Sequence, residues 1–218
     1  MVREAVRRAN VDNGGFIVEN SAFILRATLK FYGGNTLLLP KKAFITKGVG
    51  KHKEKLTSFE MALRDAKIAE FNLVRVSSIF PPHCTLVPRS KGLKNLFPGQ
   101  IVHVVISENA TNEPNRLIAA ATGIALPKDT SRHGYISEHH SYGQNDTIAG
   151  EYAEDLAAYM LATTLGAPFD PDKSYDEQKD IWDISGNIVK TTNTTQTAVG
   201  DKSGLWTTVI SSVVFCEF

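Results

Sequence analysis

Two stretches of the chain place apolar residues at helical spacing. In the first, an i, i+3, i+4, i+7 pattern forms one buried stripe: Phe59, Ala62, Leu63 and Ala66. We predict that this helix is capped by Thr57 or Ser58 and ends near Glu70. The second helix is predicted over 147–165. Gly166 ends it, because glycine readily adopts the left-handed conformation that follows many helices.

Runs rich in β-branched or alternating residues predict the strands. They cover 42–50, 72–79, 100–107, 116–126, 133–139, 184–199 and 205–215. The first strand is expected to run into a glycine turn at Gly48-Val49-Gly50, and Asp201–Gly204 is expected to form a hairpin turn between the last two. Strands and helices mix without a regular βαβ rhythm. The pattern therefore predicts an α+β fold, a layered α/β sandwich with mainly antiparallel sheets.

The first 35 of the 218 residues differ from the rest in pattern. Residues 1–35 carry clustered arginines and two glycine pairs, and we expect a poorly packed extension there. Residues 36–218 are expected to form the single domain. No stretch has the length and apolarity of a signal peptide or a membrane helix, so we expect a cytoplasmic protein.

Charge and cysteine usage narrow the function classes. The net charge is +1 and the pI is about 7.8, which gives no strong field to attract nucleic acid or an anionic membrane. Cys84 and Cys216 lie far apart and match no metal or redox spacing, so we expect buried or idle thiols.

Several other candidate sites are weak. His139 and His140 are neighbours on a strand and point to opposite faces, so they do not readily share a metal ion. The acidic residues of 170–180 lack the glycine and terminal glutamate of a calcium loop. A serine hydrolase is disfavoured because no Gly-x-Ser-x-Gly elbow is present.

The serine pair Ser77-Ser78 is the strongest chemical signal. Two serines at a strand end usually just meet solvent, but here apolar residues surround them and Pro81-Pro82 fixes the exit of the chain. In a rigid Ser-Ser peptide the second hydroxyl can attack the preceding carbonyl carbon and move the acyl group from nitrogen to oxygen. β-Elimination and loss of ammonia then leave a pyruvoyl group at residue 78. The step needs a donor for the oxyanion, and the Asn72 amide is a candidate.

Three motifs in the same order resemble the pyruvoyl-dependent arginine decarboxylase family. They are the helix beginning at Phe59-Glu60 with the run 71–82 (FNLVRVSSIFPP), then 124–129 (IALPKD), then 134–138 (GYISE). The resemblance covers about residues 37–218, and the run around the serines is highly specific.

The resemblance implies roles for individual residues. Ser78 becomes the covalent pyruvoyl group, Ser77 ends the N-terminal fragment after cleavage between 77 and 78, and Asn72 assists the self-processing. Glu138 matches a glutamate close to the pyruvoyl group and is a candidate proton donor. An acid there must be protonated near neutral pH, so Glu138 should have a raised pKa if it is buried.

A second group of residues is implied to bind substrate. Glu60 matches a carboxylate that binds the substrate guanidinium, and Leu56 and Ile79 are assigned to the same pocket. Some members of the family carry aspartate at the position of Glu60, so the side chain here is one methylene longer. This departure affects the depth of the pocket and leaves its charge unchanged.

The implied activity is decarboxylation of L-arginine to agmatine and CO2 through a Schiff base to the pyruvoyl group, which serves polyamine synthesis or acid resistance. No metal and no pyridoxal phosphate is expected. The family forms homotrimers with active sites between neighbouring subunits. Two alternatives stay open: the same chemistry on another amino acid, and a non-processing relative with a structural or regulatory role in a trimer.

Overall fold

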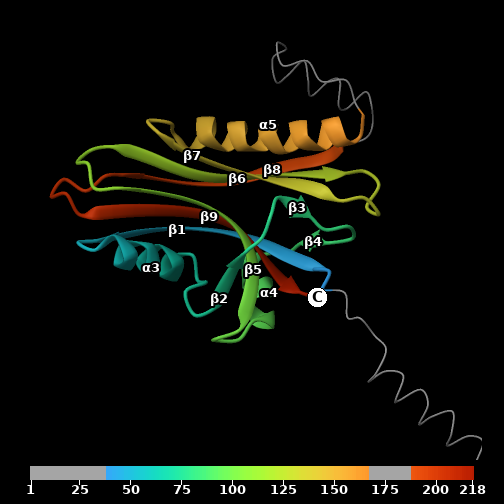
Figure 1. Ribbon diagram of the computed structural model, residues 1–218, viewed down its shortest axis with the longest axis horizontal. Coiled ribbons are helices and arrows are strands. Elements are labelled where there is room, and N and C mark those ends of the chain that lie inside the picture. The colour runs from blue at the N-terminus through green and yellow to red at the C-terminus, as the bar shows by residue number, and fades with distance from the viewer. Residues whose placement is uncertain (1–37, 167–187) are drawn as a thin grey trace, which may run out of the picture. The chain divides into compact units, whose positions relative to one another are not determined.

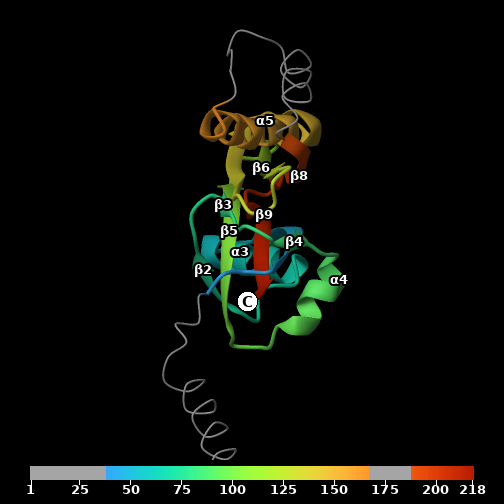
Figure 2. The ribbon, with the colours of Figure 1, turned by 90° about the vertical axis from the view of Figure 1, so that its right-hand side faces the viewer.

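A computed structural model describes residues 38–166 and 188–218, and residues 39–218 form one compact unit. Two β-sheets stack face to face in this unit, and a helix covers the outer face of each (Figure 1). Figure 2 shows the same unit turned by 90°, with α5 lying over β6 and β8. The predicted α+β sandwich is therefore confirmed. The extension expected over residues 1–35 lies outside the described residues.

The first sheet has five strands in the order β2-β5-β9-β1-β4. Its strands are β1 (Lys42–His52), β2 (Asn72–Arg75), β4 (Thr85–Leu86), β5 (Ile101–Thr111) and β9 (Trp206–Glu217). The three long strands pair antiparallel, and the short strands β2 and β4 pair in parallel at the two edges. The helix α3 (Lys55–Asp65) packs on β1 and β9, and α4 (Arg89–Gly92) with the 3-10 turn Leu93–Asn95 lies near β1.

The second sheet has four antiparallel strands in the order β3-β7-β6-β8. They are β3 (Ile79–Phe80), β6 (Leu117–Pro127), β7 (Gly134–Tyr142) and β8 (Ile188–Val199). The helix α5 (Asp146–Thr164) covers the outer face of this sheet (Figure 1). Its predicted position is confirmed: the side chain of Asn145 caps its start by accepting a hydrogen bond from the Ile148 amide, and Gly166 follows its end with a φ of 71°.

Each interface between layers has its own composition. Large apolar side chains fill the space between α3 and the first sheet and between the two sheets, whereas alanines dominate beneath α5. Small side chains let backbones approach closely: a Cβ added at Gly123 of β6 would lie 2.1 Å from the carbonyl oxygen of Ala153 in α5. Buried hydroxyls also join the sheets, and Thr122 Oγ1 lies 2.8 Å from Ser211 Oγ.

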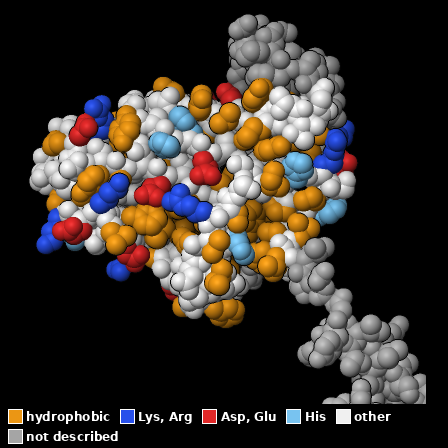
Figure 3. All heavy atoms as spheres, in the orientation of Figure 1, with side chains coloured by type: hydrophobic (Ala, Val, Ile, Leu, Met, Phe, Trp, Pro, Cys, Tyr) orange, Lys and Arg blue, Asp and Glu red, His pale blue; other side chains and the backbone are white. Residues whose placement is uncertain are grey.

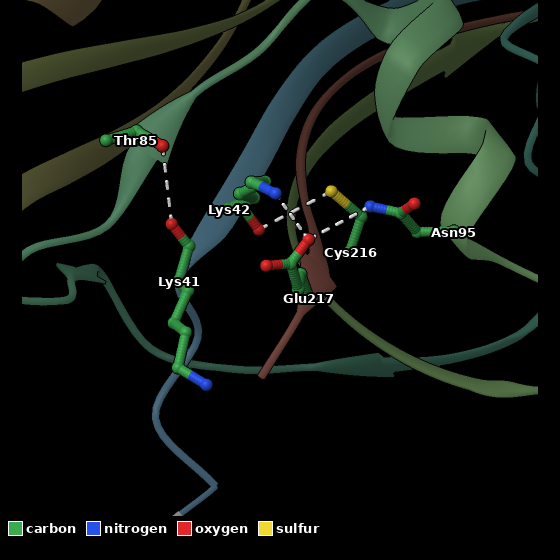
Figure 4. A network of polar contacts seen from close by, with 6 residues as sticks. All are labelled: Lys41, Lys42, Thr85, Asn95, Cys216 and Glu217. Atoms are coloured by element: carbon green, nitrogen blue, oxygen red, sulfur yellow. Dashed lines mark hydrogen bonds and ion pairs between the residues drawn. The ribbon is translucent and has the colours of Figure 1, made fainter.

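The end of β9 is fastened by polar contacts (Figure 4). Lys42 Nζ lies 2.6 Å from Glu217 Oε2, and Asn95 Nδ2 donates to the same oxygen at 3.3 Å. Cys216 beside them is buried, as is Cys84, and neither forms a disulfide. Burial raises the pKa of the Cys84 thiol to about 12, which keeps it protonated and unreactive. The interpretation of both cysteines as buried thiols is confirmed.

Two predictions about the first helix and the glycines before it are wrong. The helix runs from Lys55 to Asp65, and its N-cap position, Glu54, makes no side-chain capping bond. Ser58 is instead buried, with its hydroxyl 2.7 Å from that of Thr208. The predicted turn at 48–50 is continuous strand, because its glycines provide room for α3: a Cβ at Gly50 would lie 2.1 Å from the Ser58 carbonyl oxygen.

Two further predictions placed consecutive segments in one sheet, and both are wrong. The strand predicted over 72–79 is two strands, β2 and β3, which belong to different sheets. The turn at Asp201–Gly204 joins β8 to β9, but these strands also lie in different sheets and form no hairpin. In each case the chain crosses between the layers, and local periodicity does not distinguish this from a continuous sheet.

Candidate active site

The peptide between Ser77 and Ser78 lies where the chain crosses from one sheet to the other (Figure 1). Before it, the Val76 amide donates to the Val104 carbonyl of β5 at 2.9 Å. After it, the Ser78 carbonyl accepts from the Ile136 amide of β7 at 2.8 Å. Both sides of the serine pair are therefore anchored to long strands, and the pair itself belongs to neither sheet.

The carbonyl group that precedes Ser78 already has a hydrogen-bond donor. The Ser77 carbonyl oxygen accepts from the Ile79 amide at 2.9 Å, which closes a three-residue turn around Ser78. A nucleophile that attacks this carbonyl carbon places negative charge on the same oxygen. A donor fixed there stabilises that charge without having to reorganise. Ser78 is half-buried. Because Ser78 directly follows the Ser77 carbonyl in the chain, its hydroxyl is a side-chain nucleophile close in sequence to that carbonyl carbon.

Glu138 lies on the strand that holds Ser78. It follows Ile136 by two residues on β7, so it is about 7 Å farther along and on the same face. It lines a cavity of about 390 Å³ together with charged and polar side chains that include Lys55, Arg75, Glu108 and His140. Burial raises the pKa of the Glu138 carboxyl, while the nearby charges of Arg75 and His140 oppose that shift. The expected direction of the pKa shift is thus present, although Glu138 is exposed by its surface area.

Figure 3 shows acidic, basic and histidine side chains close together on the left half of one face, and a mainly apolar area to their right. The described residues include exposed apolar side chains on strands beside the serine crossover. These are Val74 on β2, Ile79 on β3 and Ile101 on β5, of which Ile101 is 62% exposed.

Of the two substrate-binding residues predicted on α3, Glu60 lies at a second cavity, of about 540 Å³, and Leu56 does not line it. Glu60 lines it with Arg64 and Lys67, and the Glu60 carboxylate pairs with the Arg64 guanidinium at 3.0 Å. Leu56, on the same helix, is 79% exposed. No residue lines both this cavity and the one at Glu138. Within one chain, the structure therefore does not bring Glu60 into the cavity of Glu138.

Asn72 lies at the opposite end of β2 from the serines. Its side-chain amide donates to the Gly99 carbonyl at 2.7 Å. Asn72 precedes Ser77 by five residues, which span at most about 16 Å of extended chain. Ile79, in contrast, directly follows Ser78 and is 39% exposed. Within one chain, the structure thus groups Ser77, Ser78, Ile79 and Glu138, and it places Asn72 apart from them.

Sequence reasoning missed the ion pair beside Glu138. Arg75 Nη2 of β2 lies 2.7 Å from Glu108 Oε2 of β5. Arg75 could have been predicted as a site residue, because it is a positively charged residue only two positions before the serine pair. Nothing in the sequence pointed to Glu108, because only the pairing of β2 with β5 brings the two residues together.

The other candidate chemistries gain no support from the described parts of the chain. No group of three or more His, Cys, Asp or Glu there could hold a metal ion, and His139 is engaged with Gln144, with His139 Nε2 2.7 Å from Gln144 Oε1. Within 38–166 and 188–218, no helix is long and apolar enough to cross a membrane. The acidic segment 170–180 lies outside the described residues.

Comparison with known proteins gives one consistent result. The family profile described as pyruvoyl-dependent arginine decarboxylase (PvlArgDC) matches residues 42–218. A probable pyruvoyl-dependent arginine decarboxylase of Chloroherpeton thalassium is 59% identical over 176 residues, which cover 81% of this chain and 97% of the relative. Pyruvoyl-dependent arginine decarboxylase 2 of Methanosarcina mazei is 57% identical over 178 residues, covering 82% of this chain and 97% of the relative. The corresponding enzyme of Methanococcoides burtonii is also 57% identical over 178 residues, covering 82% and 99%.

Proposed function

Because the chain belongs to the pyruvoyl-dependent arginine decarboxylase family, we propose that it cleaves itself between Ser77 and Ser78 and then converts L-arginine to agmatine and CO2. The observation that carries the proposal is the anchored Ser77-Ser78 crossover, in which the carbonyl to be attacked already accepts a hydrogen bond from the Ile79 amide. The family is pyruvoyl-dependent, and Ser78 is the residue here that fits as the source of that group.

The self-cleavage would use the chain's own groups and one water molecule. The Ser78 hydroxyl attacks the Ser77 carbonyl carbon, the carbon–nitrogen bond breaks, and an ester links the two residues. A base then removes the α-proton of residue 78, and the Ser77 carboxylate leaves. Water replaces the nitrogen of the resulting dehydroalanine, which departs as ammonia. The Ile79 amide stabilises the oxygen that becomes negative in the first step.

A pyruvoyl group at residue 78 would supply a carbonyl for the substrate amine and an electron sink for the loss of CO2. Glu138 is the proposed source of the proton that the substrate α-carbon then needs. A carboxylic acid donates only while it is protonated, so activity depends on Glu138 staying neutral at the working pH. Burial raises the pKa of Glu138 and favours this form, and activity should fall as the pH rises through that pKa.

The guanidinium of arginine needs an anionic partner, and Glu60 is the proposed one. A carboxylate and a guanidinium form two parallel hydrogen bonds, which favours a cationic substrate over an acidic one. The Glu60 carboxylate is paired with Arg64, and this ion pair would have to break before Glu60 could bind the substrate. That exposed pair is worth only about 0–1 kcal/mol, so the exchange is cheap.

We further propose a homotrimer with active sites between subunits. Two observations support it: Glu60 and Glu138 line separate cavities within one chain, and exposed apolar side chains lie on the strands beside the serine crossover. The cytoplasmic location expected from the sequence stays a prediction.

Intact-protein mass spectrometry tests the proposal. Freshly purified protein should give two fragments that part after Ser77, the larger one lighter by one ammonia than simple hydrolysis would leave it. Ser78→Ala should stay a single chain. The cleaved protein should release CO2 from arginine faster than from lysine or ornithine. A chain that never cleaves would instead favour the structural relative, and cleavage with preference for another amino acid would overturn the assigned substrate.

A further inference from the structure

The cavity at Glu138 is also lined by a positively charged side chain, Arg75, and a positive charge close to Glu138 opposes its role as a proton donor. Arg75 reaches the cavity from β2 and Glu138 from β7. An opposite charge within about 4–6 Å lowers the pKa of a carboxyl group by about 1–3 units. A guanidinium paired with Glu138 would therefore keep the carboxyl ionised near neutral pH. An ionised Glu138 has no proton to donate.

The structure pairs this cation with a different carboxylate. Arg75 Nη2 lies 2.7 Å from Glu108 Oε2, and the side chain of Glu108 is the less exposed of the two, at 29% against 57%. Within the described residues, the side chain of Glu138 forms no hydrogen bond and no ion pair. Glu108 and Glu138 line the same cavity and are alternative ion-pair partners for Arg75. In the structure, Arg75 pairs with Glu108.

The other charged groups around the cavity affect the pKa of Glu138 less than Arg75 does. His140 comes from the same strand as Glu138, and its charge opposes the raised pKa of Glu138 less than that of Arg75 does. Lys55 comes from α3, and its ammonium group lies 5.2 Å from the centre of the Trp206 ring. Arg75 is thus the cation with the largest effect on Glu138.

We propose that Glu108 is a positioning residue that holds the Arg75 guanidinium away from Glu138, so that Glu138 keeps the proton required by the reaction. This inference rests on the proposed function, because it assigns Glu108 a task only if Glu138 is the proton donor. This role requires no contact between Glu108 and the substrate or the reacting atoms. Glu108 acts through Arg75 alone, and that restriction makes the inference testable.

The experiment is a double-mutant cycle on the pH dependence of kcat, measured with saturating arginine on cleaved protein. At high pH, kcat should fall as Glu138 loses its proton, and we call this fall the alkaline limb. Glu108→Ala frees Arg75 to approach Glu138, so the alkaline limb should move to lower pH by about one unit. Arg75→Met removes the cation, so the limb should move to higher pH. In the Arg75→Met background, Glu108→Ala should cause no further shift, because the guanidinium that it released is gone.

Two controls accompany the cycle. Glu113→Ala breaks the Arg116–Glu113 ion pair, of similar length at 2.8 Å but outside this cavity, and should leave the limb unchanged. Because Arg75 lies two residues before Ser77, its replacement could slow cleavage. Rates are therefore divided by the fraction of cleaved chains, determined by mass spectrometry.

The outcomes separate this inference from the function on which it rests. If Glu138→Gln abolishes decarboxylation but Glu108→Ala leaves the limb in place, the inference is wrong and the proposed function stands. If Glu108→Ala shifts the limb equally with and without Arg75, Glu108 acts directly on Glu138 and the positioning role is wrong. If Glu138→Gln keeps the wild-type activity and limb, Glu138 is not the proton donor, and both assignments fail while the cleavage result is unaffected.

Discussion

At the scale of single residues, the hydrogen-bond donor on the Ser77 carbonyl is a backbone amide, where a side chain was expected. Asn72 was the predicted donor for the oxyanion, but its amide is bound to Gly99 at the far end of β2. The donor on the Ser77 carbonyl is the amide of Ile79. Any residue except proline supplies such an amide, so no side-chain pattern in the sequence could have revealed it.

Replacing Ile79 tests this donor. Ile79→Pro removes the amide hydrogen and disfavours the turn at Ser78, whereas Ile79→Ala keeps the amide. Loss of one oxyanion donor typically costs about 10²–10³-fold in rate. We expect self-cleavage of Ile79→Pro to slow by at least about 100-fold and that of Ile79→Ala to stay close to wild type, as followed by the disappearance of the intact chain. Equal cleavage rates for the two variants would exclude the amide as the donor.

At the scale of elements, close approach between layers depends on glycine in β1. Gly50 faces α3 at a distance that leaves no room for a Cβ, and the same strand was expected to turn at this point. Glycines within a short run indicate either a turn or a close contact, and their spacing alone does not separate the two. The packing of α3 on β1 shows that these glycines serve a close contact, and this packing exists only in the folded chain.

Gly50→Ala measures that contact. The added methyl group must displace the Ser58 carbonyl and with it the start of α3, so we expect a loss of about 3 kcal/mol in the free energy of unfolding, from urea denaturation. Gly166→Ala is the comparison: its methyl group meets nothing within 4 Å but adopts a positive φ, which costs about 1 kcal/mol. Similar losses in both variants would mean that helix packing contributes nothing beyond backbone conformation.

At the scale of the whole molecule, the residues predicted to act together do not all meet in one chain. Glu138 and the serine pair share the region where the two sheets meet, and Glu60 lines a different cavity. A site completed by a neighbouring subunit would reconcile these positions with a single reaction. The proposed trimer supplies such a neighbour.

Complementation between subunits tests this arrangement. Glu60→Ala and Ser78→Ala should each be nearly inactive alone. When the two are co-expressed, mixed trimers should contain some sites with an intact Ser78 from one subunit and an intact Glu60 from its neighbour, and arginine decarboxylation should return. If both residues of a site come from the same chain, co-expression restores nothing. Two different affinity tags, one on each variant and used in sequence, isolate the mixed assemblies, and light scattering gives the mass of those assemblies.

The sequence by itself determined what depends on neighbours along the chain. It located the serine pair and its proline exit, the long helix predicted over 147–165, and the strands on which Glu138 and Arg75 lie, because hydrophobic periodicity and turn residues are local signals. Only the tertiary structure decided that the chain changes sheets at Ser77-Ser78, that Glu108 holds Arg75, and that the glycines of β1 face a helix. These features arise from pairing between segments far apart in sequence. Such pairing is fixed by how the layers pack, and local pattern carries no record of it.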